Sequence, residues 1–252
     1  MNEVQAVLDA IEHLKPPTVP TFALRSLQNI LGGYGEGDML YGVPVPLLRK
    51  IAKGHRSVSI KICELLLQHQ LHEARYTALV LLNEKFQKNP KEVLDTYLRN
   101  TKFVNNWDLV DLSAPHIVGK FCLQTGNNDV ILNLADKENL WENRIAVVAT
   151  LPLIKSGQFA LTLQLCERFL HHPHPLLHKA CGWMLREVSK RDAESVLEFF
   201  RKHSDAPSVM RGYALEWVKG PLKITSHRVV SKHHQAHEGA NWYAIGINYE
   251  ST

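Results

Sequence analysis

The sequence contains no long hydrophobic run. The LVLL run at 79–82 is short, and the longer apolar stretch 147–154 is interrupted by Thr150 and Pro152, whereas a membrane-spanning helix needs roughly 18 consecutive apolar residues. The first ten residues, MNEVQAVLDA, carry acids and lack the basic and then apolar pattern of a secretion signal. We therefore expect no membrane contact and a location in the cytoplasm, in association with the nucleoid.

Cysteine is scarce, and neither sign of charge dominates. The four cysteines are far apart and form no CxxC motif: Cys63, Cys122, Cys166 and Cys181. This spacing favours small reduced core residues over disulfides or a zinc site, so we expect no metal and no cofactor. Lys plus Arg number 29 against 25 Asp plus Glu, a net charge of +4 that is too small to indicate a polyanionic partner by itself. With 45% hydrophobic residues, disorder and a collagen-like fold are excluded.

Helical periodicity dominates what is present. Apolar residues at spacings of 3 and 4 between Val4 and Leu14 predict an amphipathic helix that ends before Pro16. The glycine-rich stretch 32–38 predicts a loop, and Pro46 stands where the first turn of a further helix tolerates it. Alternation with a period of two never persists before residue 221, so we predict an all-α fold.

A repeat of 32 to 35 residues runs through the chain. It relates the middles of successive candidate helices, at Arg75, Leu109, Arg144, Lys179 and Arg211. Each of these helices follows another amphipathic segment, at 57–69, 91–99, 128–135, 158–170 and 193–202. A helix-pair repeat of this length is typical of an α-solenoid, whose equivalent helices line one concave face. An irregular helical bundle is the alternative.

Residues 105–121 predict a helix with two candidate functional residues on one face. Trp107 and Asp111 are four positions apart, so an indole and a carboxylate stack beside the apolar stripe of the helix. Pro115, one turn further on, should bend or interrupt the helix. In the alternative interpretation Trp107 packs in the core and Asp111 pairs with a neighbouring arginine.

A second candidate site is a cationic stripe. Lys179, Trp183, Arg186 and Lys190 follow one another at spacings of 4, 3 and 4 and share one helix face. Cations one turn apart match successive phosphates, and an indole offers a flat surface to a sugar or base. In a solenoid, the repeat register adds three more cations to the same concave wall: Arg75, Arg144 and Arg211. The alternative is a solvated basic face with a partly buried tryptophan. A cluster of histidines comprises His171, His172, His174 and His178. Pro173 and Pro175 mark it as a loop, so we predict a connection between helices there instead of a metal site.

Four segments in the same order resemble the AlkD-like DNA alkylation repair proteins: YGVPVPLLRKIAK (41–53), NNWDLVDLSAPHIVG (105–119), WENRIAVVATLPLI (141–154) and HKACGWMLREVSKRD (178–192). The resemblance implies a HEAT-like repeat domain over residues 1–219. It also implies a DNA glycosylase, acting as a monomer, that removes N3- and N7-alkylated purines such as 3-methyladenine and 7-methylguanine from DNA in base excision repair. The family's active-site residues map to Asp111, Trp107 and Trp183, and its cleft arginines to Arg144 and Arg186. Residues 220–252 have no counterpart, so we treat them as a C-terminal extension of unknown role.

A non-catalytic module, either a HEAT-like DNA-binding protein or a protein scaffold, is the rival function. The stripe of cations around a tryptophan disfavours a protein scaffold. A carboxylate among those cations weakens DNA binding, so its presence indicates a function other than binding DNA tightly. A metal-dependent hydrolase ranks last, because no HExxH or comparable ligand spacing occurs.

Overall fold

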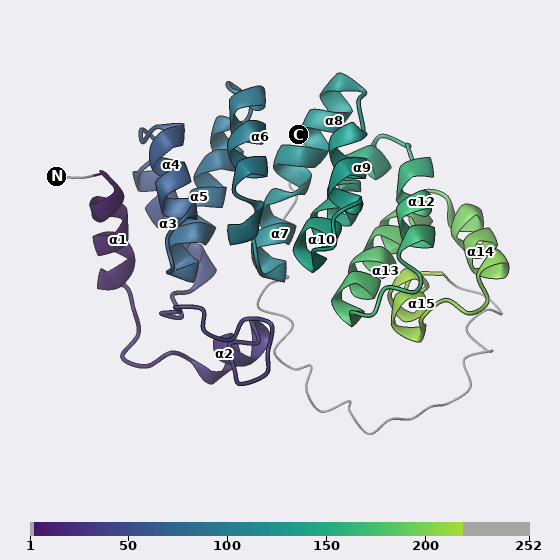
Figure 1. The fold of residues 1–252 in the computed structure, drawn as a ribbon, viewed down its shortest axis with the longest axis horizontal. Helices are drawn as coiled ribbons and strands as arrows, with labels where there is room; N and C mark the ends of the chain where they lie inside the picture. The colour runs from purple at the N-terminus through teal and green to yellow at the C-terminus, as the bar shows by residue number, and fades with distance from the viewer. Residues whose placement is uncertain (1–2, 219–252) are drawn as a thin grey trace. The chain divides into compact units, whose positions relative to one another are not determined.

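The computed structural model describes residues 3–218, so the extension at 220–252 lies outside the described residues. Every regular element in the described part is helical, and the only β-type pairing there is an isolated bridge between Met39 and Leu71. The predicted all-α class is therefore confirmed (Figure 1). Within residues 3–218 no helix is both long enough and apolar enough to cross a membrane.

The chain divides into two compact units, of which the first holds described residues 3–81. It contains α1 (Glu3–His13), α2 (Thr21–Ser26), α3 (Val45–Gly54), α4 (Ile60–Leu67) and most of α5 (His72–Lys85). Helix α1 packs against α3 and α4 and buries Val7 and Ile11 completely. The predicted first helix, the glycine-rich loop and the place of Pro46 in the first turn of α3 are confirmed.

The second unit holds described residues 82–218. Its elements are α6 (Pro90–Arg99), η1 (Thr101–Phe103), α7 (Trp107–Ser113), η2 (Pro115–Gly119), α8 (Lys120–Thr125), α9 (Asp129–Ala135), α10 (Leu140–Val148), α11 (Leu151–Lys155), α12 (Ala160–Arg168), α13 (Pro175–Ser189), α14 (Ala193–Lys202) and α15 (Ser208–Ala214). The helices of the predicted pairs from residue 91 onward are present here, and α9 packs on α10 as α12 packs on α13 (Figure 1). The arrangement of these pairs into a solenoid with a concave basic face stays a prediction.

The repeat register has a structural use at the ends of the helices. Arg75 Nη1 donates to two carbonyl oxygens just beyond α4, at 3.3 and 3.1 Å. Arg211 Nη2 does the same just beyond α14, at 3.3 and 3.1 Å. Asn143, next to the register residue of α10, donates to three carbonyl oxygens at the end of α9, the shortest at 2.8 Å. Asn143 thus satisfies terminal carbonyls of α9 that have no partner inside the helix, while Arg75 and Arg211 hold the connections that follow α4 and α14.

Proline 115 interrupts the helix of the candidate site, as predicted. Residues Pro115–Gly119 form one π-helical turn in which the Gly119 N–H donates to the carbonyl of Ala114, five residues back, at 2.9 Å. A π turn accommodates proline because the hydrogen-bond ladder shifts by one residue. Gly119 also lies so close to α10 that an added Cβ would be 2.2 Å from the Ala149 carbonyl oxygen. The turn therefore sets how α7 is presented beside α10.

The cysteines and most of the clustered histidines occupy the kinds of place that the sequence predicts. All four cysteines are free and buried, and burial raises the pKa of the Cys122 thiol to about 11. Residues 171–174 form the connection between α12 and α13. The prediction was wrong for His178, which is a buried residue of α13, because the helix starts directly after the connection, at Pro175. No group of three or more His, Cys, Asp or Glu within residues 3–218 is placed to hold a metal ion.

Candidate functional site

Helix α7 carries the first two candidate residues. It begins at Asn106, whose side chain accepts the Trp107 N–H at 2.8 Å and so caps the helix. Leu109 and Val110 on the inner face are fully buried, whereas Trp107 and Asp111 are each partly exposed. The spacing thus puts the indole and the carboxylate on the part of α7 that the core does not cover.

Asp111 forms a two-pronged ion pair with Arg144 of α10. Arg144 Nε donates to Oδ1 at 3.0 Å and Nη2 donates to Oδ2 at 2.8 Å. The remaining terminal nitrogen, Nη1, donates to the carbonyl oxygen of Leu176 in the first turn of α13 at 2.7 Å. Only 6% of the Arg144 side chain and 11% of the Asp111 side chain are exposed. Arg144 therefore ties together α7, α10 and α13, and the pairing of Asp111 with a neighbouring arginine is confirmed.

The environment of this pair perturbs the carboxyl group. Burial raises the pKa of Asp111 above its ordinary value, the charge and hydrogen bonds of Arg144 oppose that rise, and the charge of Asp108 adds to it. Loss of Arg144 would therefore raise the pKa of Asp111 further. The arginine thus favours the ionised form of this poorly solvated carboxyl group, against the effect of burial.

The stripe predicted on α13 coincides with the part of that helix that is not fully buried. Lys179, Trp183 and Arg186 are partly exposed and Lys190 is exposed, while most of the intervening residues are buried. Gly182 lets α15 approach α13 closely, since an added Cβ there would lie 2.6 Å from the Met210 carbonyl oxygen. The stripe therefore lies beside the contact with α15, with its tryptophan partly exposed.

Two of these cations have acidic partners that the sequence reasoning missed. Arg186 Nη1 donates to Glu216 at 2.5 Å, and Lys190 Nζ donates to Glu187 at 2.6 Å. Lys190 also lies 6.0 Å from the centre of the Trp217 ring. The Glu187–Lys190 spacing of three on a helix was a readable signal. The partner of Arg186 comes from beyond α15, and nothing in the local sequence indicates it.

Arg75 and Arg211, the other register cations, are also engaged within the protein. Arg75 is buried and paired with Asp38, with 5% and 12% of the two side chains exposed. Hydrogen bonds from His72 and Arg75 outweigh the effect of burial and hold the pKa of Asp38 below its ordinary value. Arg211 is partly exposed, and its guanidinium lies 4.7 Å from the centre of the Phe200 ring. Arg75 and Arg211 thus both direct their guanidinium groups to partners inside the protein.

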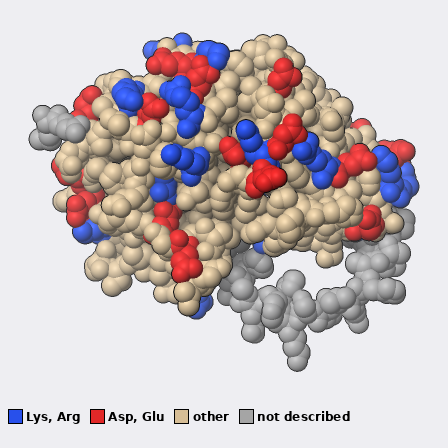
Figure 2. Space-filling model, in the orientation of Figure 1, with Lys and Arg blue, Asp and Glu red and all other residues tan. Residues whose placement is uncertain are grey.

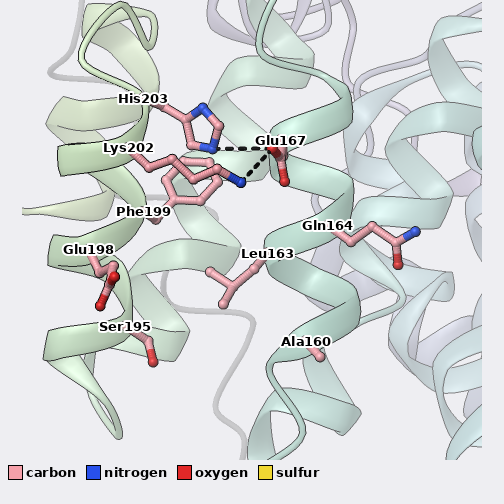
Figure 3. A pocket seen from close by; sticks show the side chains of 9 residues that line it. All are labelled: Ala160, Leu163, Gln164, Glu167, Ser195, Glu198, Phe199, Lys202 and His203. Atoms are coloured by element: carbon pink, nitrogen blue, oxygen red, sulfur yellow. Dashed lines mark hydrogen bonds and ion pairs between the residues drawn. The ribbon is translucent and has the colours of Figure 1, made fainter.

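Neither the charge on one face of the molecule nor the pocket between α12 and α14 adds to the site. On the face drawn in Figure 2 basic and acidic side chains are interspersed. A pocket of about 400 Å³ lies between α12 and α14 and contains none of the predicted site residues. It holds an ion pair between Glu167 and Lys202 at 2.9 Å, with His203 Nε2 3.6 Å from the same carboxylate (Figure 3). These contacts link neighbouring helices and involve none of the predicted site residues.

Comparison with known families decides the affiliation of the chain. The family model described as "DNA alkylation repair enzyme" matches residues 21–218. The chain belongs to the DNA alkylation repair enzyme family. The match spans both candidate helices, so the resemblance of the four sequence segments is confirmed for this repair family.

A solved structure supports the fold of this family member. It is similar to a protein described as "Predicted DNA alkylation repair enzyme from Enterococcus faecalis", with a TM-score of 0.66 and 19% sequence identity. The likeness covers 82% of this chain and 100% of the other. At this identity the comparison concerns the fold alone. The search of curated proteins found no significant match.

Proposed function

We propose that the protein is a DNA glycosylase that releases positively charged N3- and N7-alkylated purines, such as 3-methyladenine and 7-methylguanine, from DNA. The observation that carries the proposal is the carboxylate of Asp111, held by Arg144 on a partly exposed face of α7 one turn from Trp107. Family membership supplies the class of substrate, because the family is one of DNA alkylation repair enzymes.

The chemistry of such a lesion fits a single carboxylate. A purine alkylated at N3 or N7 already carries positive charge, so the electron pair of the bond between sugar and base passes to the purine and the base leaves neutral. The sugar becomes cationic in the transition state, and ionised Asp111 near its C1′ atom stabilises that charge. Water then adds to C1′, and its proton passes to Asp111 or to solvent. No strong general acid is needed.

The remaining residues bind and orient the lesion. Trp107 and Trp183 flank the deoxyribose and exclude water, which strengthens the field of the carboxylate. Lys179, Arg186 and Lys190 contact phosphates from the exposed face of α13, and the ion pairs of Arg186 and Lys190 are exposed enough for a phosphate to displace them. In this proposal the lesion is recognised from the backbone side, without extrusion into a deep pocket. Arg144 acts first by holding Asp111, and contact of Arg144, Arg75 or Arg211 with phosphate stays a prediction.

Base release from methylated DNA tests the function. The full chain is incubated with randomly methylated DNA, and free 3-methyladenine and 7-methylguanine are measured by chromatography. Release of either base above the rate without protein supports the proposal. Salt-dependent DNA binding without base release would replace it with the binding module, and neither binding nor release would favour a protein scaffold. The monomeric state is tested in the same preparation by its mass in solution.

A further inference from the structure

The connection before α13 ends in a histidine, His174, that has no role in the proposed mechanism. His174 occupies the N-cap position of α13 with extended backbone (φ −96°, ψ 122°), and its Nδ1 accepts the Leu176 N–H at 3.2 Å. Pro175, the first helical residue, has no N–H. The Leu176 N–H is therefore the first amide donor of the helix, and an imidazole nitrogen satisfies it.

The same first turn anchors the arginine of the candidate site. Leu176, whose N–H is held by His174, gives its carbonyl oxygen to Arg144 Nη1 at 2.7 Å. Two further hydrogen bonds, from Nε and Nη2 of Arg144, hold both oxygens of Asp111. A chain of hydrogen bonds thus leads from an imidazole through one backbone residue and one guanidinium to the carboxylate.

This chain requires a particular protonation state of His174. A histidine nitrogen accepts a hydrogen bond only when it carries no proton, and in the imidazolium ion both nitrogens are donors. Protonated His174 would direct an N–H at the Leu176 N–H and break the cap. The groups that face His174 are Arg144 from α10, His178 from α13 and His172 from the connection, and all of them oppose a positive charge there.

The pKa of His174 is lowered, first by burial and then by the charges of those three groups. Near neutral pH the imidazole is therefore neutral, and the cap is intact. A histidine also binds a nearby backbone amide in the connection before α5, where His69 Nδ1 accepts the Leu71 N–H at 3.0 Å and the His69 carbonyl accepts from Arg75.

We infer that His174 is a positioning residue for the proposed glycosylase: its neutral imidazole keeps the first turn of α13 formed, and that turn fixes Arg144 and through it Asp111. The inference rests on the proposed function. It adds that acid inactivates the site by releasing this turn as well as by protonating the carboxylate. His174 touches neither substrate nor the reacting atoms.

Three variants of the full chain test the inference. His174→Ala removes the cap, and His174→Asn keeps an acceptor that does not titrate and is among the preferred N-cap residues. His171→Asn is the matched control, because His171 is in the same connection and 80% of its side chain is exposed. The readouts are Tm between pH 8 and pH 5, the titration midpoint of the Asp111 carboxyl by ¹³C NMR, and single-turnover base release with protein in excess over DNA.

We expect His174→Ala to lower Tm by about 2–4 °C at pH 8, the usual effect of a lost cap in a protein of this size. As pH falls from 8 to 5 the wild type should lose a similar amount relative to His174→Asn. The sign follows from linkage: the unfolded chain binds a proton more readily than folded His174 with its lowered pKa, so the stability that His174 contributes is lost as pH falls through that window. His171→Asn should follow the wild type throughout.

The carboxyl titration separates positioning from capping alone. If Arg144 loosens in His174→Ala, the Asp111 midpoint moves upward and base release slows severalfold at unchanged DNA affinity, and His174→Asn restores both. An unmoved Asp111 midpoint in His174→Ala, or parallel Tm curves for the wild type and His174→Asn, would overturn the inference. These two readouts do not depend on catalysis, so a wild type that releases no base refutes the proposed function while they still decide the role of His174.

Discussion

Replacing Asp111 with asparagine keeps the size of the side chain and one oxygen acceptor and removes the charge. Losing one member of a buried ion pair costs about 3–5 kcal/mol when the partner charge is left uncompensated. The loss here should be smaller, because asparagine still accepts one hydrogen bond from Arg144 and because burial, which raises the pKa of Asp111, penalises the ionised form that the substitution removes. We expect about 1–3 kcal/mol of lost stability, or a fall in Tm of about 2–12 °C.

That loss leaves the variant folded at 25 °C. A protein with a stability of at least about 5 kcal/mol retains about 2 kcal/mol in the worst case, and a few per cent of the molecules are then unfolded. If Asp111 were only a structural partner of Arg144, base release would therefore fall by a few per cent. If Asp111 stabilises the cationic sugar, release should fall about a hundredfold or more, although the lability of the charged lesion raises the background.

A matched control is available in the first unit. Asp38 pairs with Arg75 at almost the same burial, with 12% and 5% of the side chains exposed against 11% and 6% for Asp111 and Arg144. Asp38→Asn should lower Tm at least as much, because the pKa of Asp38 is held below its ordinary value, and it should leave base release near the wild-type rate. Release is measured under single-turnover conditions with protein in excess, so that differences in DNA affinity do not enter. Equal base release by folded Asp111→Asn and Asp38→Asn would remove Asp111 from the mechanism.

Three further predictions address other contacts of the site. Arg144→Gln should move the acidic limb of the pH profile of base release to higher pH, because Arg144 holds the pKa of Asp111 down; a limb at the wild-type position would show that another group controls it. Lys190→Gln should reduce the slope of log Kd against log salt concentration by about one. An unchanged slope would show that Lys190 stays paired with Glu187 and contacts no phosphate. Gly182→Ala would place a Cβ 2.6 Å from a carbonyl oxygen of α15, so we expect a loss of about 1–3 kcal/mol; a wild-type Tm would show that the two helices separate freely.

The helices were predictable because their signals are local. Apolar spacing, the prolines and the glycine-rich segment each act within a few residues, and the bounds of α1, α3 and α14 follow them closely. The face of α13 was predictable for the same reason, since the stripe around Trp183 needs only helical geometry.

The sequence could not provide the partners that charged side chains find in distant parts of the chain. Asp111 and Arg144 are 33 residues apart, and the third contact of Arg144 is a backbone carbonyl, which has no signature in a sequence. Glu216, the partner of Arg186, lies 30 residues away from it. A list of cations on one face therefore overestimates the charge available to a phosphate, because tertiary contacts decide which of those cations are already paired.

Arg211 is a register position for which the sequence and the structure predict different roles. Its position in the register predicted a phosphate contact, whereas the structure shows Nη2 donating to two carbonyl oxygens beyond α14 and the guanidinium against the Phe200 ring. If Arg211 serves to hold the connection after α14, Arg211→Gln should lower Tm by about 2–4 °C and leave the salt dependence of DNA binding unchanged. A phosphate contact predicts the opposite, an unchanged Tm and a slope lower by about one. We expect the first outcome, because a guanidinium already held by two carbonyls and an aromatic ring would have to give up those contacts to reach a phosphate. A reduced slope at wild-type Tm would show that the register marks a DNA-binding wall after all.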